Sequence, residues 1–377
     1  LRLSQPAAPG VRLMRPSDPA WAETVARARS SIFHTAGYHQ YTAGFGRGTP
    51  FLAVVGDEEA GVAWPYLLRT VGSSRLPSGS QVMDVGSVYG YPGPLVWGWA
   101  MDGPKLGEAL ALVAETWRLQ GAVSVFTRFN PLLDNAAAMP ASPAWATPGS
   151  PGVVRSGMTV SVDLTLDIDE IRGHYSRGLA REIRRGREAG LITTDDTEWT
   201  ALPEFSEQYR ETMERLQATG FYYFTQVDFV RLHRCLPEAA HLLVTRLGDR
   251  LAAAGLFLES GDHLEWHLVS SSNELIELSP SKVLVEDAIE WAQQRGFAAM
   301  HLGGGRGAQA DSLYFFKGRF SPRRHQFAVG SWVLDGDRYA DLVTRHLERL
   351  PTGATIDPSF FPAYRAWPKV SPPVGPT

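Results

Sequence analysis

Short apolar runs separated by turn residues dominate the first part of the chain and predict strands. Phe51–Val55 and Gly61–Leu68 are rich in β-branched and aromatic residues, and the acidic turn between them predicts a hairpin. Apolar residues then recur with a helical period over 104–120, before a further apolar run. We expect helices over residues 19–30 and 104–120, and strands over 51–55, 61–68 and 123–129.

The second half repeats this plan. Alternation over 159–164 predicts a strand, and a strongly basic helical segment follows it. We expect helices over 202–218, 281–295 and near 337–349, an antiparallel meander over 242–246, 251–258 and 263–269, and a strand over 298–302. Strands, helix and strand in each half predict an α+β fold of two modules with a similar plan.

The composition changes between Asn135 and Gly152, where Ala, Pro and Ser predominate. Such a segment is typical of a linker or surface loop. Because 377 residues exceed what one hydrophobic core usually fills, we place a domain boundary there. We expect a first domain over 1–150, completed by the tail over 335–377, and a second domain over 151–334.

Bulk composition is ordinary for a globular protein, with 44% hydrophobic and 20% charged residues. The net charge of −4 means that any contact with nucleic acid must come from local patches. The single cysteine, Cys235, excludes an internal disulfide and indicates a reducing compartment. The chain has no apolar run of about 18 residues and no signal-peptide core, so we expect a cytoplasmic protein without stable membrane insertion.

The strand over 298–302 leads into a run of three glycines, Gly303–Gly305, and then into an aromatic-flanked lysine, Lys317. Glycine has no Cβ, so such a run lets the backbone approach a ligand closely. Four arginines lie nearby in sequence: Arg306, Arg319, Arg323 and Arg324. The pattern predicts a site where cations meet negative charge, although a glycine loop alone is equally typical of a tight strand-to-helix turn.

Three further segments carry a recognisable pattern. Tyr89–Leu95 reads Y-G-Y-P-G-P-L, Arg181–Leu191 reads R-E-I-R-R-G-R-E-A-G-L, and Asp311–Phe320 reads D-S-L-Y-F-F-K-G-R-F. Together with the glycine loop from His301 to Gly305, they resemble, in matching order over about residues 20–335, the Fem (FemABX-like) aminoacyl transferases. The resemblance implies two tandem GNAT-like domains with mixed central sheets flanked by helices.

The resemblance also implies an activity. Members of this family pass an amino acid from aminoacyl-tRNA to an amine, most often on a peptidoglycan precursor and sometimes on an antibiotic intermediate. We therefore expect an aminoacyltransferase that acts on a cell-wall precursor or a peptide-like natural product, with no cofactor, no metal and no DNA partner.

Two departures from the family pattern matter. Peptidoglycan-acting relatives often carry an acidic residue after the G-P of the first loop, whereas Leu95, Val96 and Trp97 stand here. Some relatives also insert a long helical arm, whereas only a short segment separates Gly190 from Pro203. The first departure puts the peptidoglycan substrate in doubt, and the second indicates that the arm is absent.

Aminoacyl transfer passes through a tetrahedral oxyanion, which a positioned cation stabilises. Lys317 matches the family's lysine and is our candidate for that role, against the alternatives of a surface lysine or an ion pair with Asp311. His301, His267 and Asp311 are rival candidates for the base that takes the amine proton. A free amine with a pKa near 8 could also lose its proton in solution, leaving no base to find.

Binding residues are assigned in three groups. The basic segment places Arg177, Arg181 and Arg184 on one helix face, which suits a polyphosphate or simply a solvated face. The candidates for tRNA or phosphate binding are Arg177, Arg181, Arg184, Arg185, Arg319, Arg323 and Arg324. The candidates for substrate binding are Phe316, Tyr89, Tyr91, His267, Gly303, Gly304, Gly305, Arg306, Tyr222 and Tyr223; the last two could stack a base or pack in the core.

Two alternatives to this function remain open. One is an acyl-CoA-dependent N-acyltransferase on the same fold, whose pyrophosphate loop is usually rich in glycine. The corresponding segment here, Ser270–Glu277, has no glycine and two acids, which argues against CoA. The other is a non-catalytic module that binds tRNA or cell-wall fragments, against which the glycine loop and Lys317 both weigh.

Overall fold

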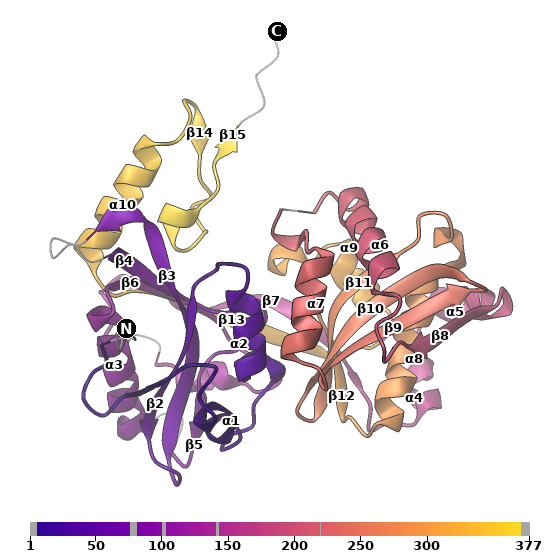
Figure 1. Ribbon diagram of the computed structural model, residues 1–377, viewed down its shortest axis with the longest axis horizontal. Helices are drawn as coiled ribbons and strands as arrows, with labels where there is room; N and C mark the ends of the chain where they lie inside the picture. The colour runs from indigo at the N-terminus through magenta and orange to yellow at the C-terminus, as the bar shows by residue number, and fades with distance from the viewer. Residues whose placement is uncertain (1–5, 76–80, 100–102, 141–142, 219, 371–377) are drawn as a thin grey trace. The chain divides into compact units, whose positions relative to one another are not determined.

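The computed structural model describes residues 6–75, 81–99, 103–140, 143–218 and 220–370. The chain divides into two compact units (Figure 1). Unit 1 comprises Leu1–Arg155 and Ala328–Thr377, and unit 2 comprises Ser156–Phe327. Each is a mixed sheet flanked by helices, as expected for an α+β fold.

In unit 1 the strands lie in the order β1-β2-β3-β4-β6-β13, and β5 pairs with β3. The β4–β6 pair is parallel. The pairs β1–β2, β2–β3, β3–β4, β3–β5 and β6–β13 are antiparallel. The strands are β1 (Arg12–Met14), β2 (Thr49–Gly56), β3 (Gly61–Arg75), β4 (Gln81–Gly86), β5 (Leu95–Trp97), β6 (Ala122–Arg128) and β13 (Arg324–Val333). The helices are α1 (Ala20–Val25), α2 (Ala36–Ala43), α3 (Pro104–Leu119) and α10 (Gly336–Glu348), and β14 (Ala354–Thr355) pairs with β15 (Lys369–Val370).

Strand β2 shows why both faces of this sheet are covered. Phe51, Ala53 and Val55 belong to one buried cluster with the apolar face of α3. The alternate residues Leu52 and Val54 belong to a second cluster with Trp21 and Val25 of α1. Successive side chains of a strand point to opposite faces, so an unbroken apolar run gives a strand buried on both sides.

The segment over 135–152, predicted as a linker or surface loop, is mostly irregular, but several of its described residues are buried in unit 1. Residues 141 and 142 lie outside the described residues. Asn135 is buried, and its side-chain amide donates to the carbonyl oxygens of Pro92 (2.7 Å) and Pro94 (3.1 Å). Trp145 packs in the core of unit 1 against Trp117 and Trp332. The composition is that of a loop, but two large anchors fix the segment to the unit.

The predicted helix over 19–30 is also too long. Helix α1 ends at Val25, and Ser31 then begins a short 3-10 helix over Ile32–His34. The backbone N–H of Ser31 donates to Nδ1 of His34 at 3.1 Å, and the Ser31 hydroxyl lies 2.9 Å from the same nitrogen. This local pairing fixes the short helix that follows α1. The other predicted helices and strands are present, most with ends shifted by one to three residues. The strand predicted over 61–68 continues to Arg75, and the strand predicted over 159–164 already begins at Gly152.

In unit 2 the strand order is β7-β12-β11-β10-β9-β8. Only the β11–β12 pair is parallel among these neighbours. The strands are β7 (Gly152–Asp163), β8 (Leu191–Asp195), β9 (Ala240–Leu247), β10 (Arg250–Ser260), β11 (His263–Ser271) and β12 (Ala299–Gly304). The helices are α4 (Ile168–Gly173), α5 (Arg177–Glu188), α6 (Leu202–Arg215), α7 (Gln226–Cys235), α8 (Pro280–Gln294) and α9 (Ser312–Lys317).

Helices cover both faces of this sheet as well (Figure 1). Leu264 and Trp266 of β11 share a buried cluster with Leu284 and Ile289 of α8 and with Ile183 of α5. Helices α6 and α7 carry a separate buried aromatic group, made of Phe205, Tyr209 and Phe229. Among the described residues, no helix is both long and apolar enough to cross a membrane.

The parallel strands β11 and β12 are paired over only three positions, ending at Glu265 and His301. Beyond that point each strand carries an irregularity. His267 is the extra residue of a bulge against β10, and the register of β12 against β7 shifts between His301 and Gly303. Bulges bend a strand and re-aim its side chains, so β11 and β12 separate here. This separation point positions the candidate site.

Candidate functional site

Lys317 ends helix α9 and lies at the point where β11 and β12 separate. Its ammonium donates a hydrogen bond to the carbonyl oxygen of Gly304 at 2.9 Å and lies 5.2 Å from the centre of the Trp266 ring. The residue is only 9% exposed. Desolvation by burial lowers the pKa of Lys317 to about 8, and the charges of Asp311 and Glu265 oppose this shift. A buried ammonium with an aromatic face and one carbonyl as neighbours is strongly under-solvated.

The glycine loop shapes the space beside this ammonium. Gly303 has a φ of +75°, and a Cβ there would lie 3.3 Å from Nζ of Lys317. A Cβ on Gly305 would meet the carbonyl oxygen of Gln309 at 2.1 Å and Asp311 at 2.4 Å. Gly303 therefore serves close approach to the cation, while Gly305 serves the tight turn that follows. The tight turn is present at Gly305, and the close approach of a ligand to the loop stays a prediction.

The Asp311 carboxylate accepts hydrogen bonds from other residues of the loop. One carboxylate oxygen accepts from the backbone N–H of Tyr314 at 3.0 Å and caps α9. The other accepts from Nε and the backbone N–H of Arg306, at 3.0 and 3.2 Å. Burial opposes ionisation of Asp311, but these donors outweigh it and lower its pKa. Arg306 also donates to the carbonyl oxygen of Leu216 at 3.1 Å, so its guanidinium ties the loop to the end of α6.

The buried carboxylate of Glu265 contacts two buried histidines next to the point where β11 and β12 separate. Glu265 accepts from Nδ1 of His301 at 2.7 Å and lies 3.2 Å from Nε2 of His263. Burial opposes ionisation, but the charges and hydrogen bonds of His301 and His263 lower the pKa of Glu265 to about 2. Sequence reasoning selected His301 and missed Glu265 and His263, although a Glu between apolar residues in the strand H-L-E-W-H-L-V was a signal.

Two further histidines lie around this cluster. His267, the bulged residue of β11, has its pKa lowered to about 4 by desolvation, which the charge of Glu265 opposes. His325 lies 2.7 Å from the Ser161 hydroxyl through Nε2. Desolvation first, and then the charges of His301 and Arg323, lower the pKa of His325 to about 4. Both rings are therefore neutral at pH 7.

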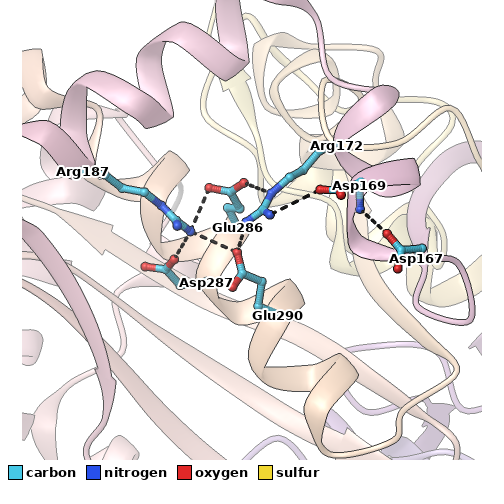
Figure 2. A network of polar contacts seen from close by, with 7 residues as sticks. All are labelled: Asp167, Asp169, Arg172, Arg187, Glu286, Asp287 and Glu290. Carbon is cyan, nitrogen blue, oxygen red and sulfur yellow. Dashed lines mark hydrogen bonds and ion pairs between the residues drawn. The ribbon is translucent and has the colours of Figure 1, made fainter.

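The arginines of α5 divide into two kinds. Figure 2 shows Arg187 turned toward α8, where it lies 3.0 Å from Glu286, 2.6 Å from Asp287 and 3.1 Å from Glu290. Arg172 of α4 approaches Glu286 and Glu290 from the other side, and Asp169 lies 3.9 Å away. The three acids of α8 could hold a metal ion by their geometry alone, but the two guanidinium groups fill that space.

Arg184 and Arg185 have weak or backbone partners, Glu188 at 3.8 Å and the carbonyl oxygen of Glu277. Arg177 and Arg181 are exposed and have no hydrogen bond or ion pair to other residues in the described ranges. They are the cations of α5 that are available to an external anion.

The arginines near Lys317 are held by the protein itself. Arg319 pairs with Glu182 at 2.5 Å, and Arg323 pairs with Asp163 at 2.7 Å. Arg324 donates to the carbonyl oxygen of Ser321 at 2.6 Å and to the hydroxyl of Tyr314 at 3.1 Å. A ligand phosphate would have to displace these partners.

The aromatic candidates are dispersed. Phe316 packs 6.1 Å from the Trp266 ring, beside Lys317. Tyr222 is half-buried, with its carbonyl accepting from the Tyr209 hydroxyl at 2.9 Å, whereas Tyr223 is 40% exposed. Tyr89 and Tyr91 belong to unit 1, in a loop held by Tyr38, whose hydroxyl donates to the Tyr89 carbonyl at 2.7 Å. In unit 2 the structure brings Lys317 together with Phe316, Trp266 and the glycine loop, whereas His301 lies with Glu265.

The start of α8 is a poor phosphate cradle. The helix begins with Pro280, which removes one of the free N–H groups that a helix N-terminus offers to an anion. Ser279 before it has a φ of +55°. Its own carbonyl already accepts from the N–H groups of Lys282 and Val283. In the preceding loop, Glu274 pairs with Arg250.

Comparison with known proteins supports the fold. Residues 173–318 match the family model described as acetyltransferase (GNAT) domain. No curated protein is significantly similar in sequence. Among solved structures, the chain is similar to FemX with a TM-score of 0.62 and 13% identity, covering 87% of this chain and 99% of that one.

Two other solved structures are similar at low identity. A conserved protein of unknown function from Bacteroides thetaiotaomicron has a TM-score of 0.55 and 10% identity, over 86% of this chain and 99% of that chain. The C-terminal domain of a protein named as a lysylphosphatidylglycerol synthetase, from Agrobacterium fabrum, has a TM-score of 0.50 and 15% identity, over 86% of this chain and 95% of that one. The chain thus has a GNAT-like α+β fold, shared with FemX over 87% of this chain.

Proposed function

We propose that this protein is an acyltransferase that moves an amino acid from aminoacyl-tRNA to an amine and forms an amide. The GNAT-type fold supports acyl transfer as the reaction class. The acceptor would be an amine of a peptidoglycan precursor or of a peptide-like natural product. We also propose that residues 1–150 with the tail over 335–377 form one GNAT-like domain and residues 151–334 the other.

The observation that carries the proposal is the buried ammonium of Lys317. When an amine attacks the ester carbonyl, negative charge develops on the carbonyl oxygen. One of the three donors of Lys317 is used by Gly304, and no second acceptor lies within hydrogen-bond distance among the described residues. In this poorly solvated place a cation stabilises an oxyanion more strongly than it would in water.

His301 is the proton acceptor in this proposal. Asp311, its rival, already accepts three hydrogen bonds within the loop. His267 is the second rival, and its depressed pKa makes it a weak base. His301 is held by a carboxylate at its Nδ1, the arrangement that orients an imidazole for proton transfer at the other nitrogen.

The choice of donor rests on two features of unit 2. The start of α8, where CoA-dependent relatives would bind pyrophosphate, has a proline in place of one N–H donor, and the segment before it contains two acids. Arg177 and Arg181 project from α5 without partners in the described parts of the chain and suit the phosphates of an RNA. We assign Tyr223 and Tyr222 to the surface that receives the donor's terminal base, and Tyr89 and Tyr91 to the acceptor side.

The test is a donor competition with purified protein. The protein is incubated with a pool of charged tRNAs and a mixture of amine acceptors, and separately with acyl-CoAs and the same acceptors. We expect amide formation with charged tRNA that ribonuclease abolishes, and no thioester consumption. Transfer from acyl-CoA alone would instead establish the CoA-dependent alternative, and no turnover with either donor would support a binding module.

A further inference from the structure

A chain of four titratable groups runs through unit 2 from solvent to the separation of β11 and β12. Asp262 is exposed in the turn before β11, and one of its oxygens lies 3.1 Å from Nδ1 of His263. His263 continues to Glu265 at 3.2 Å, and Glu265 continues to Nδ1 of His301 at 2.7 Å. His263, Glu265 and His301 are all buried.

The strand register explains how these groups meet. Glu265 and His301 face each other at the last paired position of the parallel strands, and Ser161 of β7 faces His301 from the other side. Leu264 and Trp266, the neighbours of Glu265 in β11, point into the apolar cluster with α8. His263 and Glu265 therefore point to the opposite face, where alternation gathers the polar groups in one row.

Burying these ionisable groups is expected to lower the stability of the fold, so their presence points to a function. A buried carboxylate between two histidines loses its hydration, and apolar residues of similar size often stabilise a core equally well or better. Groups of this kind are concentrated at functional sites, where proton affinities are tuned. The row also ends at the residue that the proposed reaction uses as its base.

We infer that Glu265 and His263 are positioning residues for proton transfer by His301. The Glu265 carboxylate accepts Nδ1–H of His301, which leaves Nε2 of His301 as the proton acceptor. His263, held between the carboxylates of Asp262 and Glu265, donates from both ring nitrogens and keeps Glu265 ionised. This inference rests on the proposed acyl transfer and extends it to residues outside the glycine loop.

The proton balance is closed within the site. The amine nitrogen forms a bond to the ester carbonyl carbon, and Nε2 of His301 takes a proton from that nitrogen. The bond between the carbonyl carbon and the ribose oxygen then breaks, and the oxygen leaves with the electron pair. His301 returns its proton to this oxygen, so that an amide and a free ribose hydroxyl are formed and His301 is neutral again.

Other charged groups face this row and bear on its pH dependence. The charges of His301 and Arg323 act on His325 of β13, and the charge of Glu265 acts on Lys317 of α9. His267 of β11 also feels the charge of Glu265. His267 and His325, with pKa values of about 4, are neutral above pH 5, and Lys317, with a pKa of about 8, is mostly charged below pH 7. A change in the pH–rate profile between pH 5 and 7 therefore reports on the row itself.

The decisive variant is Glu265→Gln, which keeps the side-chain shape and removes the charge. We expect the single-turnover rate at saturating substrate to fall by about 10²–10⁴, as when a histidine base loses its orienting carboxylate. The acid limb of the profile should move to lower pH, because the imidazolium form of His301 loses its neighbouring anion. His263→Gln should move the limb to higher pH, because it removes a positive charge and leaves the Glu265 anion to His301 alone, and the exposed Asp262→Asn should move it least.

Glu259→Gln is the matched control. Glu259 of β10 also binds a histidine, Nε2 of His241 at 2.8 Å, in the same unit but outside this row. It should leave both the rate and the pH profile at wild-type values. If Glu265→Gln fails to fold, the profiles of His263→Gln and Asp262→Asn decide, since Asp262 is half-exposed in a turn.

A second readout needs no turnover. Ring-nitrogen NMR of the histidine-labelled protein should show His301 with its proton on Nδ1 in the wild type and a changed tautomer population in Glu265→Gln. His301 with its proton on Nε2, or wild-type rates and profiles in Glu265→Gln, would overturn the inference while leaving acyl transfer intact. If no donor supports turnover, the proposed function fails by itself, and with it the catalytic meaning of the tautomer.

Discussion

Lys317 is the residue on which the proposed chemistry depends most directly. Its ammonium is buried against Trp266 and the carbonyl of Gly304, and desolvation lowers its pKa to about 8. Because the folded-state pKa lies below the unfolded value, the charged form is disfavoured in the folded protein. The stability contribution of this group is therefore unfavourable below pH 8 and is relieved as pH rises from 8 toward the unfolded pKa. Burying the charged Lys317 therefore lowers the stability of the folded protein at neutral pH.

Lys317→Met should separate activity from stability. We expect the single-turnover rate to fall by about 10²–10³, the usual effect of removing one oxyanion donor. At pH 7 the free energy of unfolding should not fall and could rise by up to about 3 kcal/mol, since a pKa depression of this size is worth about 1.4 kcal/mol per unit. In the wild type the rate should decline as pH rises through 8, because the ammonium loses its proton.

Rates and urea unfolding curves on this variant test both parts. Lys105→Ala, at an exposed lysine in the first turn of α3, is the control and should change neither quantity. Wild-type chemistry in Lys317→Met at saturating substrate would remove Lys317 from the mechanism. A lower unfolding midpoint with proportionate loss of rate would instead assign the residue a structural role.

The sequence led to Lys317, His301 and the glycine loop because the order of motifs along the chain is itself distinctive. It could not lead to Trp266 or Glu265, since their proximity to Lys317 and His301 depends on the short pairing of β11 with β12. The sequence also suggested that more arginines are available to a ligand than the structure shows. Arg306, Arg319, Arg323 and Arg324 all have protein partners that sequence spacing does not reveal.

Helix α5 shows at the level of an element how one basic segment serves two purposes. Its apolar residues Leu179 and Ile183 are buried, and Arg187 is anchored by the acids of α8 (Figure 2). Arg177 and Arg181 lie on its exposed side. Helical periodicity predicted the amphipathic helix correctly. It could not predict which arginines find acids, because those acids come from a helix about a hundred residues further along the chain.

The double variant Arg177→Ala with Arg181→Ala tests the exposed side of α5. If both side chains contact phosphates, the slope of log affinity against log salt for tRNA should become shallower by about 1.4–1.8, since each contact contributes 0.7–0.9. Filter binding or fluorescence anisotropy over a range of salt concentrations measures this slope. Unfolding midpoints should stay at the wild-type value.

The control must remove the same charge elsewhere. Arg210→Ala with Arg345→Ala deletes two exposed arginines that pair with Glu214 and Asp341 of their own helices. The tRNA slope should be unchanged in this double variant. Equal slopes in all three proteins would mean that the exposed side of α5 is only solvated.

The segment over 135–152 shows that composition predicts an irregular backbone but does not predict whether a segment is buried. Ala, Pro and Ser favour loops, and the backbone is indeed irregular over most of this stretch. Yet the buried side-chain amide of Asn135 and the buried indole of Trp145 hold this loop in the core of unit 1. A tryptophan within a loop composition should therefore be weighed as an anchor.

At the scale of the whole molecule, unit 1 is built from two separate stretches of chain, and a buried polar group joins them. Asp84 of β4 is fully buried. Its carboxylate accepts from Arg69 at 2.6 Å, from Arg365 at 2.6 Å and from the hydroxyl of Tyr364 at 3.1 Å. Arg365 and Tyr364 come from the C-terminal stretch. The hydroxyl of Tyr364 also lies 2.7 Å from the hydroxyl of Ser124 in β6. Asp84 and Ser124 therefore both hold the short helical turn over Ala363–Arg365.

Asp84→Ala should weaken both the unit and the attachment of its C-terminal stretch. Removing one partner of a buried ion pair leaves the guanidinium groups of Arg69 and Arg365 without their counter-charge and typically costs about 3–5 kcal/mol. Urea unfolding should show this loss, and limited proteolysis should cut between residues 350 and 370 faster than in the wild type. Asp341→Ala is the control, because Asp341 makes only an exposed pair with Arg345 within α10; its unfolding and cleavage should match the wild type. If Asp84→Ala unfolds at the wild-type urea concentration and its C-terminal stretch stays protected, the carboxylate does not hold these two parts of the chain together.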